Sequence, residues 1–142
     1  MPAVVLAKVR RPGIAPRRLR RVLAHVLRRH RAPARAQVTV VLVSDRAIRV
    51  LNRRFLRKDR STDVLAFPGG DRSFLGEVVV SVDRARAQAK AAGHDPATEI
   101  ALLAAHGLLH LLGYSDRTAA RRAWMMRRQR RLLHELGIEV RG

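Results

Sequence analysis

Cysteine is absent from this chain of 142 residues. Without cysteine, no disulfide can crosslink the fold and no thiolate can bind a metal ion. Any metal site must therefore be built from histidine and carboxylate side chains. The absence is also compatible with a reducing compartment.

Aromatic residues are scarce, at 4% of the chain, whereas hydrophobic residues of all kinds make up 47%. The core is therefore predicted to consist mainly of leucine, valine, alanine and isoleucine. Only Phe74, Tyr114 and Trp124 are candidates for a surface on which nucleic-acid bases stack. The sequence thus disfavours base recognition of the kind made by the aromatic-rich sheets of RNA-recognition domains.

No apolar run approaches the ~20 residues that a membrane-spanning helix needs. The first apolar stretch ends at Arg10 and Arg11, too early for the hydrophobic region of a signal peptide. We therefore expect a soluble, cytoplasmic protein with no membrane partner.

Acidic residues are also few: 11 Asp and Glu stand against 30 Lys and Arg, and the formal net charge is +19. A GC-rich genome would explain the preference for arginine over lysine, but not the excess of basic over acidic residues. A chain this cationic repels itself unless it meets a polyanion, and nucleic acid is the commonest one. We therefore predict RNA or a ribonucleoprotein as the partner. An anionic membrane surface and a mere bias in composition are the less favoured explanations.

Hydrophobic periodicity predicts strands and helices that alternate along the chain. Strands are expected at residues 3–9, 36–44, 62–68 and 74–82, and the last two should form a hairpin across the turn-rich segment 68–73. Helices are expected at residues 15–32, 45–56, 83–93, 95–113 and 117–136. Asp45, with Ser44 as the alternative, is predicted to cap the second helix, and Gly113 to end the fourth. The predicted fold class is α/β (α+β), a single domain over residues 1–142 with one small mixed sheet packed by helices.

Two histidines lie four residues apart in the apolar run HGLLHLLGYSD, residues 106–116. On a helix, such positions lie on one face about 6 Å apart, within reach of a shared metal ion. Because the run is otherwise rich in leucine, the helix should be buried on most sides, where an imidazole without a partner costs ~1–3 kcal/mol. Either each histidine bonds a backbone carbonyl or lines a solvated edge, or His106 and His110 bind one metal ion.

A third candidate ligand, Asp116, favours the metal ion. Gly113 permits the chain to turn, so that Asp116 can return toward the end of the helix. Two imidazoles and one carboxylate form a known catalytic zinc set with one position open for water, whose pKa then falls toward ~7. A zinc peptidase of the H-E-x-x-H type would carry its general base at position 107, which is Gly107 here. The sequence therefore predicts a zinc cleft on the helix that carries His106 and His110, and disfavours a peptidase.

Three blocks of the chain resemble the YbeY family, the bacterial endoribonucleases of ribosomal RNA maturation. HGLLHLLGYSD is similar to that family's H-G-x-L-H-L-x-G-Y-D-H, and LNRRFLRKDRSTDVLAFP to its N-x-x-Y-R-x-K-D-x-P-T-D-V-L-S-F-P. LGEVVVSVDRARAQA is similar to its L-G-D-I-x-I-S segment and the helix that follows. The blocks lie within residues 51–116, and the order of the flanking elements is also similar. The resemblance implies a single α/β domain, a zinc ion bound by three histidines in a cleft, and a role in trimming or quality control of ribosomal RNA.

The chain departs from the family's pattern at two functional positions. His106 and His110 match the first two zinc ligands, whereas Asp116 stands where the family has histidine, which makes the site less electropositive. Leu56 stands where the family places a functionally important arginine, and Arg57 follows one position later. The resemblance makes His106 and Arg57 the candidate catalytic residues, with the Arg57 guanidinium steadying charge on a phosphate.

The segment RKDRSTDVLAF joins a predicted helix to a predicted strand. Asp59, Thr62 and Asp63 are turn formers, and their side chains are predicted to hold the loop by bonding to backbone amides. The alternative for Asp63 is that it orients a zinc-binding histidine. The basic residues of the loop, Arg57, Lys58 and Arg60, are predicted to bind phosphate. Further arginines lie on the first and last predicted helices, so binding to RNA should weaken steeply with salt.

These observations favour a zinc-dependent, single-strand endoribonuclease that acts on ribosomal RNA. The alternative is a non-catalytic RNA-binding or ribosome-binding assembly factor with a weakened or lost metal site, which the departures at Leu56 and Asp116 would explain. A zinc hydrolase that acts on peptides is disfavoured by Gly107 and by the net charge.

Overall fold

The structure, a computed structural model, describes residues 2–71 and 73–142. Met1, at the start of the predicted domain, and Arg72, in the predicted turn segment, lie outside the described residues. Within the described part, no helix is both long and apolar enough to cross a membrane. The elements in chain order are β1 (Ala3–Ala7), α1 (Pro16–Arg29), β2 (Gln37–Val43), α2 (Asp45–Leu56), β3 (Val64–Pro68), β4 (Phe74–Ser81), α3 (Val82–Ala92), α4 (Pro96–Leu111) and α5 (Ala119–His134).

The strands form one mixed sheet in the order β1-β2-β4-β3. β1 pairs parallel with β2, and β2 pairs parallel with β4. β3 and β4 pair antiparallel from Val64↔Val80 to Pro68↔Gly76, which confirms the predicted hairpin. The α/β class with a small mixed sheet is therefore confirmed.

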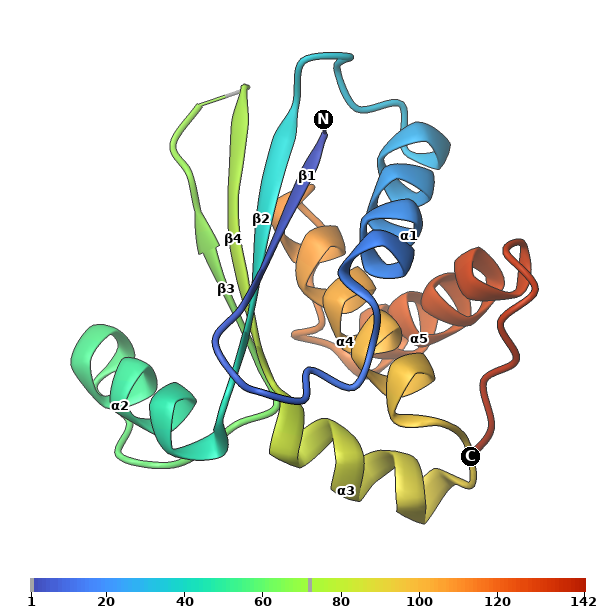
Figure 1. The fold of residues 1–142 in the computed structure, drawn as a ribbon. Helices are drawn as coiled ribbons and strands as arrows, with labels where there is room; N and C mark the ends of the chain where they lie inside the picture. Colours follow the sequence, from blue (N-terminus) through green and yellow to red (C-terminus); the bar gives the residue numbers. More distant parts are fainter. Residues whose placement is uncertain (1, 72) are drawn as a thin grey trace.

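The sheet lies between two unequal layers of helices (Figure 1). α1 and α4 cover one face, where the inward side chains of β2 and β4 join the main core, and α5 packs against α4 and α1. On the other face, α2 packs a smaller cluster around Val43, Ile48, Leu65 and Val79. α3 leaves the end of β4 and runs across the end of the sheet toward α4.

α4 is the most buried helix, as its composition predicts. Its apolar positions from Ile100 to Leu109 are all buried in the main core. This burial explains why the helix is hydrophobic on nearly every side. Only near its C-terminal end do His106 and His110 reach partly exposed positions.

The start of α2 corrects one detail of the sequence prediction. Ser44, the alternative cap, accepts a hydrogen bond from the backbone amide of Ala47 at 3.2 Å, so Asp45 is not the capping residue. The Asp45 carboxylate instead accepts hydrogen bonds from the hydroxyls of Ser61 and Ser81. It therefore ties α2 to the loop before β3 and to the end of β4.

An ionic cluster joins α1 to α5 on the outside of the helical layer. Glu135 lies 2.9 Å from His25 Nε2 and 3.0 Å from Arg29 Nε. Hydrogen bonds from Arg29 and His25 lower the pKa of the Glu135 carboxyl from its usual 4.5 to about 2. A carboxyl whose pKa is lower in the folded chain stabilises the fold while it is ionised.

We expect Glu135→Gln to lower the free energy of unfolding by about 1 kcal/mol at neutral pH, because the cluster is partly exposed. The pKa shift is downward, so the contribution is complete above pH 4.5 and disappears as the pH falls toward 2. Thermal unfolding at several pH values measures this difference. Glu139→Gln is the matched control, since the Glu139 side chain is 72% exposed and pairs with His134, five residues before it. If the difference in free energy of unfolding between the wild type and Glu135→Gln did not change with pH, the ionised Glu135 would not be the source of this stability.

Candidate metal centre

The position of α4 against the sheet depends on Gly107. A Cβ atom added there would lie 2.5 Å from Cγ1 of Val78, closer than atoms can pack. Glycine therefore allows the helix backbone to approach β4. As a result His106, which precedes it, and His110, which follows it, reach the edge of the sheet. The same contact explains why a glutamate of the peptidase type has no room at this position.

The turn after α4 brings Asp116 back to the helix. Gly113 adopts a positive φ of 103°, its amide donates to the His110 carbonyl at 3.0 Å, and the Tyr114 amide donates to the Leu109 carbonyl at 3.1 Å. These two bonds make a Schellman motif, for which glycine is the favoured residue because the left-handed conformation strains other side chains. Arg122 also donates to the Asp116 carbonyl at 3.2 Å. The turn confirms the role predicted for Gly113.

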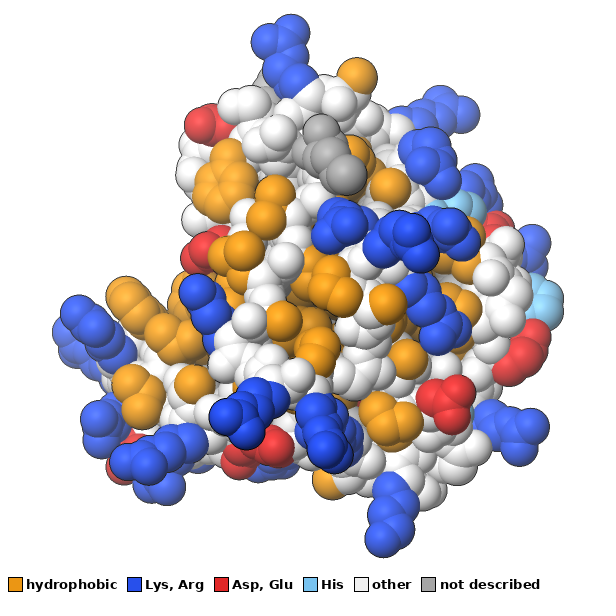
Figure 2. All heavy atoms as spheres, in the orientation of Figure 1, with side chains coloured by type: hydrophobic (Ala, Val, Ile, Leu, Met, Phe, Trp, Pro, Cys, Tyr) orange, Lys and Arg blue, Asp and Glu red, His pale blue; other side chains and the backbone are white. Residues whose placement is uncertain are grey.

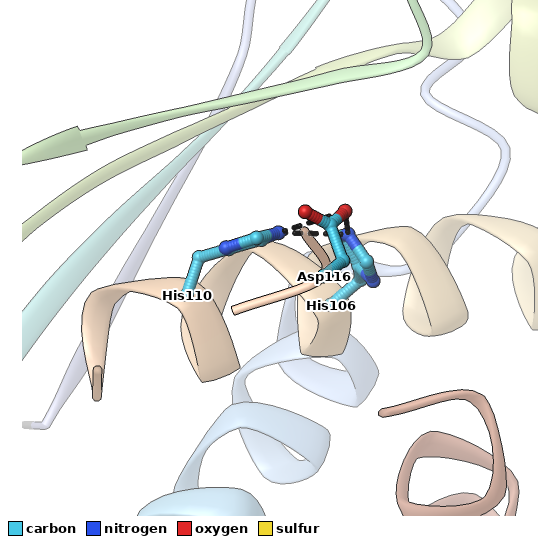
Figure 3. Close-up of side chains that lie close together, drawn as sticks. All are labelled: His106, His110 and Asp116. Carbon is cyan, nitrogen blue, oxygen red and sulfur yellow. Dashed lines mark hydrogen bonds and ion pairs between the residues drawn. The ribbon is translucent and has the colours of Figure 1, made fainter. Parts of the chain in front are cut away.

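His106, His110 and Asp116 converge on one point (Figure 3). The Nε2 atoms of the two imidazoles lie 3.0 Å apart, and Oδ2 of Asp116 lies 3.5 Å from the first and 3.4 Å from the second. All three side chains are partly exposed, so the group faces solvent on one side. The structure thus brings together all three residues for which the sequence predicted a shared metal.

The distances from the Asp116 carboxylate to the two imidazoles suit a metal ion better than hydrogen bonds. Nitrogen-to-oxygen distances of 3.4 and 3.5 Å exceed the ~2.7–3.2 Å of good N–H···O bonds. Zinc bonds of about 2.0–2.2 Å in a tetrahedron place ligand atoms roughly 3.3–3.6 Å apart. The two nitrogen-to-oxygen distances fall in this range, whereas the 3.0 Å between the two Nε2 atoms is shorter and within hydrogen-bonding distance. The donor set of two imidazoles and one carboxylate is suitable for a divalent ion.

Gln129 of α5 is a site residue that the sequence analysis missed. It is 2% exposed, and its Oε1 lies 2.6 Å from Nδ1 of His106. An amide oxygen only accepts hydrogen bonds, so Nδ1 of His106 carries the proton and Nε2 keeps its lone pair. That lone pair is directed at His110 and Asp116. A buried hydrogen bond to the outer nitrogen is the usual way in which a protein orients a metal-binding imidazole.

A cleft of about 500 Å³ opens beside the three side chains. One wall is α4 with Asp116, and the other is β3 with the two residues before it, Thr62 and Asp63. The β3 residues of that wall are apolar, so the polar side chains that line the cleft are the three converging residues together with Thr62 and Asp63.

Arg57 lies outside this cleft. It is the exposed C-terminal cap of α2, with a left-handed backbone at φ 56° and ψ 30°. Among the described residues, the cleft lining does not include it. The structure therefore brings His106, His110 and Asp116 together but leaves Arg57 at the end of a neighbouring element. Its catalytic role stays a prediction.

The loop before β3 is held by contacts other than those predicted. Asp59 pairs with the Arg49 guanidinium at 3.0 Å, and the Asp63 carboxylate accepts from the Gln88 amide at 3.3 Å. The carboxylates of Asp59 and Asp63 thus bond to side chains rather than to backbone amides. The partner of the His106 imidazole is Gln129, and Asp63 is instead tied to α3.

Comparisons with known proteins agree with this architecture. A model of the family described as Endoribonuclease YbeY matches residues 12–137. Endoribonuclease YbeY of Moorella thermoacetica is 41% identical over 134 residues, which cover 84% of this chain and 85% of that protein. Endoribonuclease YbeY of a Synechococcus species is 43% identical over 115 residues, covering 72% of this chain and 71% of that protein. The solution structure of TM1509 from Thermotoga maritima has the same fold, with a TM-score of 0.66 at 24% identity over 95% of this chain and 91% of that one.

Gly107→Ala should lower the free energy of unfolding by about 1–3 kcal/mol, because the added methyl group overpacks the contact with Val78. Val78→Ala removes the methyl groups that would clash. In the double variant the two costs should therefore be less than additive by at least about 0.5 kcal/mol. Denaturant unfolding of the wild type, the two single variants and the double variant measures this coupling. Strictly additive costs would show that Gly107 does not set the distance between α4 and β4.

Proposed function

The chain belongs to the YbeY family of endoribonucleases, and we propose that it cleaves RNA with a metal ion held by His106, His110 and Asp116. The observation that carries this proposal is the convergence of three ligand atoms in the lining of an open cleft. We further propose zinc as the ion, because two imidazoles and one carboxylate with an open position form a catalytic zinc set.

The residues of the site prepare it for hydrolysis. A divalent ion bound there would supply Lewis acidity toward a phosphodiester and lower the pKa of water near neutral pH. The Gln129 amide holds the His106 ring in the tautomer whose Nε2 faces the ion. The Asp116 carboxylate, 41% exposed, brings one negative charge to the ligand set and leaves a solvent-facing side where a substrate enters.

The charge of the protein supports RNA as the substrate. Figure 2 shows Lys and Arg side chains over much of one face of the molecule, with few acidic side chains between them. Such a surface binds phosphates largely without regard to sequence. Because the family resemblance concerns ribosomal RNA, we propose single-stranded segments of ribosomal RNA as the substrate and ribosome maturation or quality control in the cytoplasm as the setting.

We expect the protein to cleave single-stranded RNA with zinc bound, to lose this activity when a chelator removes the ion, and to regain it when zinc is returned. Asp116→Ala should lower cleavage at least about 100-fold, because it removes one of three ligands. Asp95→Ala is the matched control, since the Asp95 side chain makes no capping hydrogen bond and lies at the far end of α4. Gel-based cleavage of a labelled RNA measures all three proteins.

The same assay distinguishes the alternative function. A chain that binds RNA with high affinity but does not cleave it with zinc, manganese or magnesium would contradict the proposed nuclease. That result would instead favour a non-catalytic assembly factor with the same fold.

A second prediction concerns Arg57, which we propose binds a phosphate of the substrate. Arg57→Gly should lower cleavage at least about tenfold while keeping the free energy of unfolding within about 1 kcal/mol of wild type, because glycine adopts the left-handed conformation without strain. Arg31→Gly is the control, since Arg31 also has a positive φ, of 53°. Equal activity of the two variants would remove Arg57 from the mechanism.

A further inference from the structure

Two exposed aromatic side chains stack on each other beside the metal centre. The ring centroids of Tyr114 and Trp124 lie 4.8 Å apart with an interplanar angle of 28°. Tyr114 is 37% exposed and Trp124 is 38% exposed, although each carries a large apolar surface. In a chain with so few aromatic residues, two of them form a partly solvated stack.

His30, the residue that caps the C-terminal end of α1, contacts the Tyr114 ring of the stack. The Tyr114 hydroxyl lies 3.1 Å from Nδ1 of His30, whose ring meets the Tyr114 ring edge-on at 5.3 Å. Nε2 of His30 accepts a hydrogen bond from Nε of Arg128 at 3.1 Å. Nδ1 of a neutral His30 therefore donates to the hydroxyl, which agrees with the lowering of the His30 pKa by burial and by Arg128. The Tyr114 ring is thus oriented by His30, and Trp124 stacks on it.

A hollow of about 290 Å³ lies against the stack. Its lining combines the two aromatic rings with Arg121 and the backbone turn of Gly113 and Ser115. Ser115 is followed directly by Asp116, and two extended residues span at most about 7 Å, so the Tyr114 backbone lies within about 7 Å of that of Asp116. The hollow with its two rings and Arg121 is therefore built on the same turn that returns Asp116 to the histidines.

We propose that this hollow is a nucleotide subsite, in which a base of the RNA strand stacks on the Tyr114–Trp124 pair and Arg121 binds an adjoining phosphate. The inference rests on the proposed function, because it takes the strand in the metal cleft to be RNA. A planar, weakly polar ring joined to a phosphate is the chemistry that fits aromatic rings with a guanidinium beside them.

The subsite changes what is expected of RNA recognition. The scarcity of aromatic residues favoured binding through the backbone alone, whereas a stack beside the cleft adds contact with a base. Every base has a flat face, so the subsite tolerates different sequences. A base paired within a duplex is already stacked between its neighbours, so the subsite selects unpaired strands.

The test uses the intrinsic fluorescence of Trp124, the only tryptophan in the chain. The full-length protein is titrated with a short 2′-O-methyl single strand, with a strand of equal length that lacks bases, and with a duplex. The single strand should quench the fluorescence, whereas the strand without bases should bind more weakly and leave the emission nearly unchanged. The duplex should resemble the strand without bases.

Variants test the contribution of the ring to affinity. Trp124→Leu should weaken binding of the single strand about 5- to 150-fold, as expected for the loss of one stacked base, and Trp124→Phe should retain most of the affinity. Met126→Leu, at a 43% exposed position of the same helix, is the matched control and should bind like wild type. Fluorescence anisotropy of a labelled strand measures the affinities, and thermal unfolding verifies that each variant is folded.

The outcomes separate this inference from the proposed function. Equal quenching by the strand without bases, or unchanged affinity in both Trp124 variants, would overturn the subsite whether or not the protein cleaves RNA. Base-dependent quenching in a protein that cleaves no RNA with any divalent ion would support the subsite and overturn the nuclease.

Discussion

At Gly107 the backbone of α4 lies so close to Val78 that no side chain fits between them, and the rest of the site depends on this contact. A buried helix pressed against β4 places one face of its last two turns at the open edge of the sheet. His106 and His110 occupy that face, and β3 supplies the opposite wall of the cleft. Because the neighbouring positions on α4 are buried apolar residues, the direction of the imidazoles is determined by the packing of the core.

The site also joins elements that are distant in the chain. The Schellman turn at Gly113 returns Asp116 to the histidines, and the same turn places Tyr114 against α1 and α5. Gln129 of α5 orients His106 from the other side. A carboxylate in place of a third imidazole gives the ligand set a negative charge, which partly offsets the charge of a divalent ion within a strongly cationic protein.

The sequence alone indicated the order of the elements and the three converging residues, because both follow from local patterns. Helical periodicity placed His106 and His110 on one face, and Gly113 allowed the return of Asp116. The pairing of Gln129 with His106 has no local signature, since 23 residues separate them and only tertiary packing brings them together. The stacking of Tyr114 on Trp124 was missed for the same reason. The prediction of Asp45 rather than Ser44 as the helix cap was wrong, because the Asp45 carboxylate bonds to Ser61 and Ser81, which lie far along the chain.

The central claim is that His106, His110 and Asp116 hold one metal ion. The most direct test is the metal content of the untagged protein by plasma mass spectrometry, followed by X-ray absorption at the zinc edge. The account predicts one zinc ion per chain, with two nitrogen ligands and one carboxylate oxygen from the protein at about 2.0–2.2 Å. A wild-type protein that binds no ion after zinc supplementation, or whose bound ion has no imidazole ligands, would contradict it.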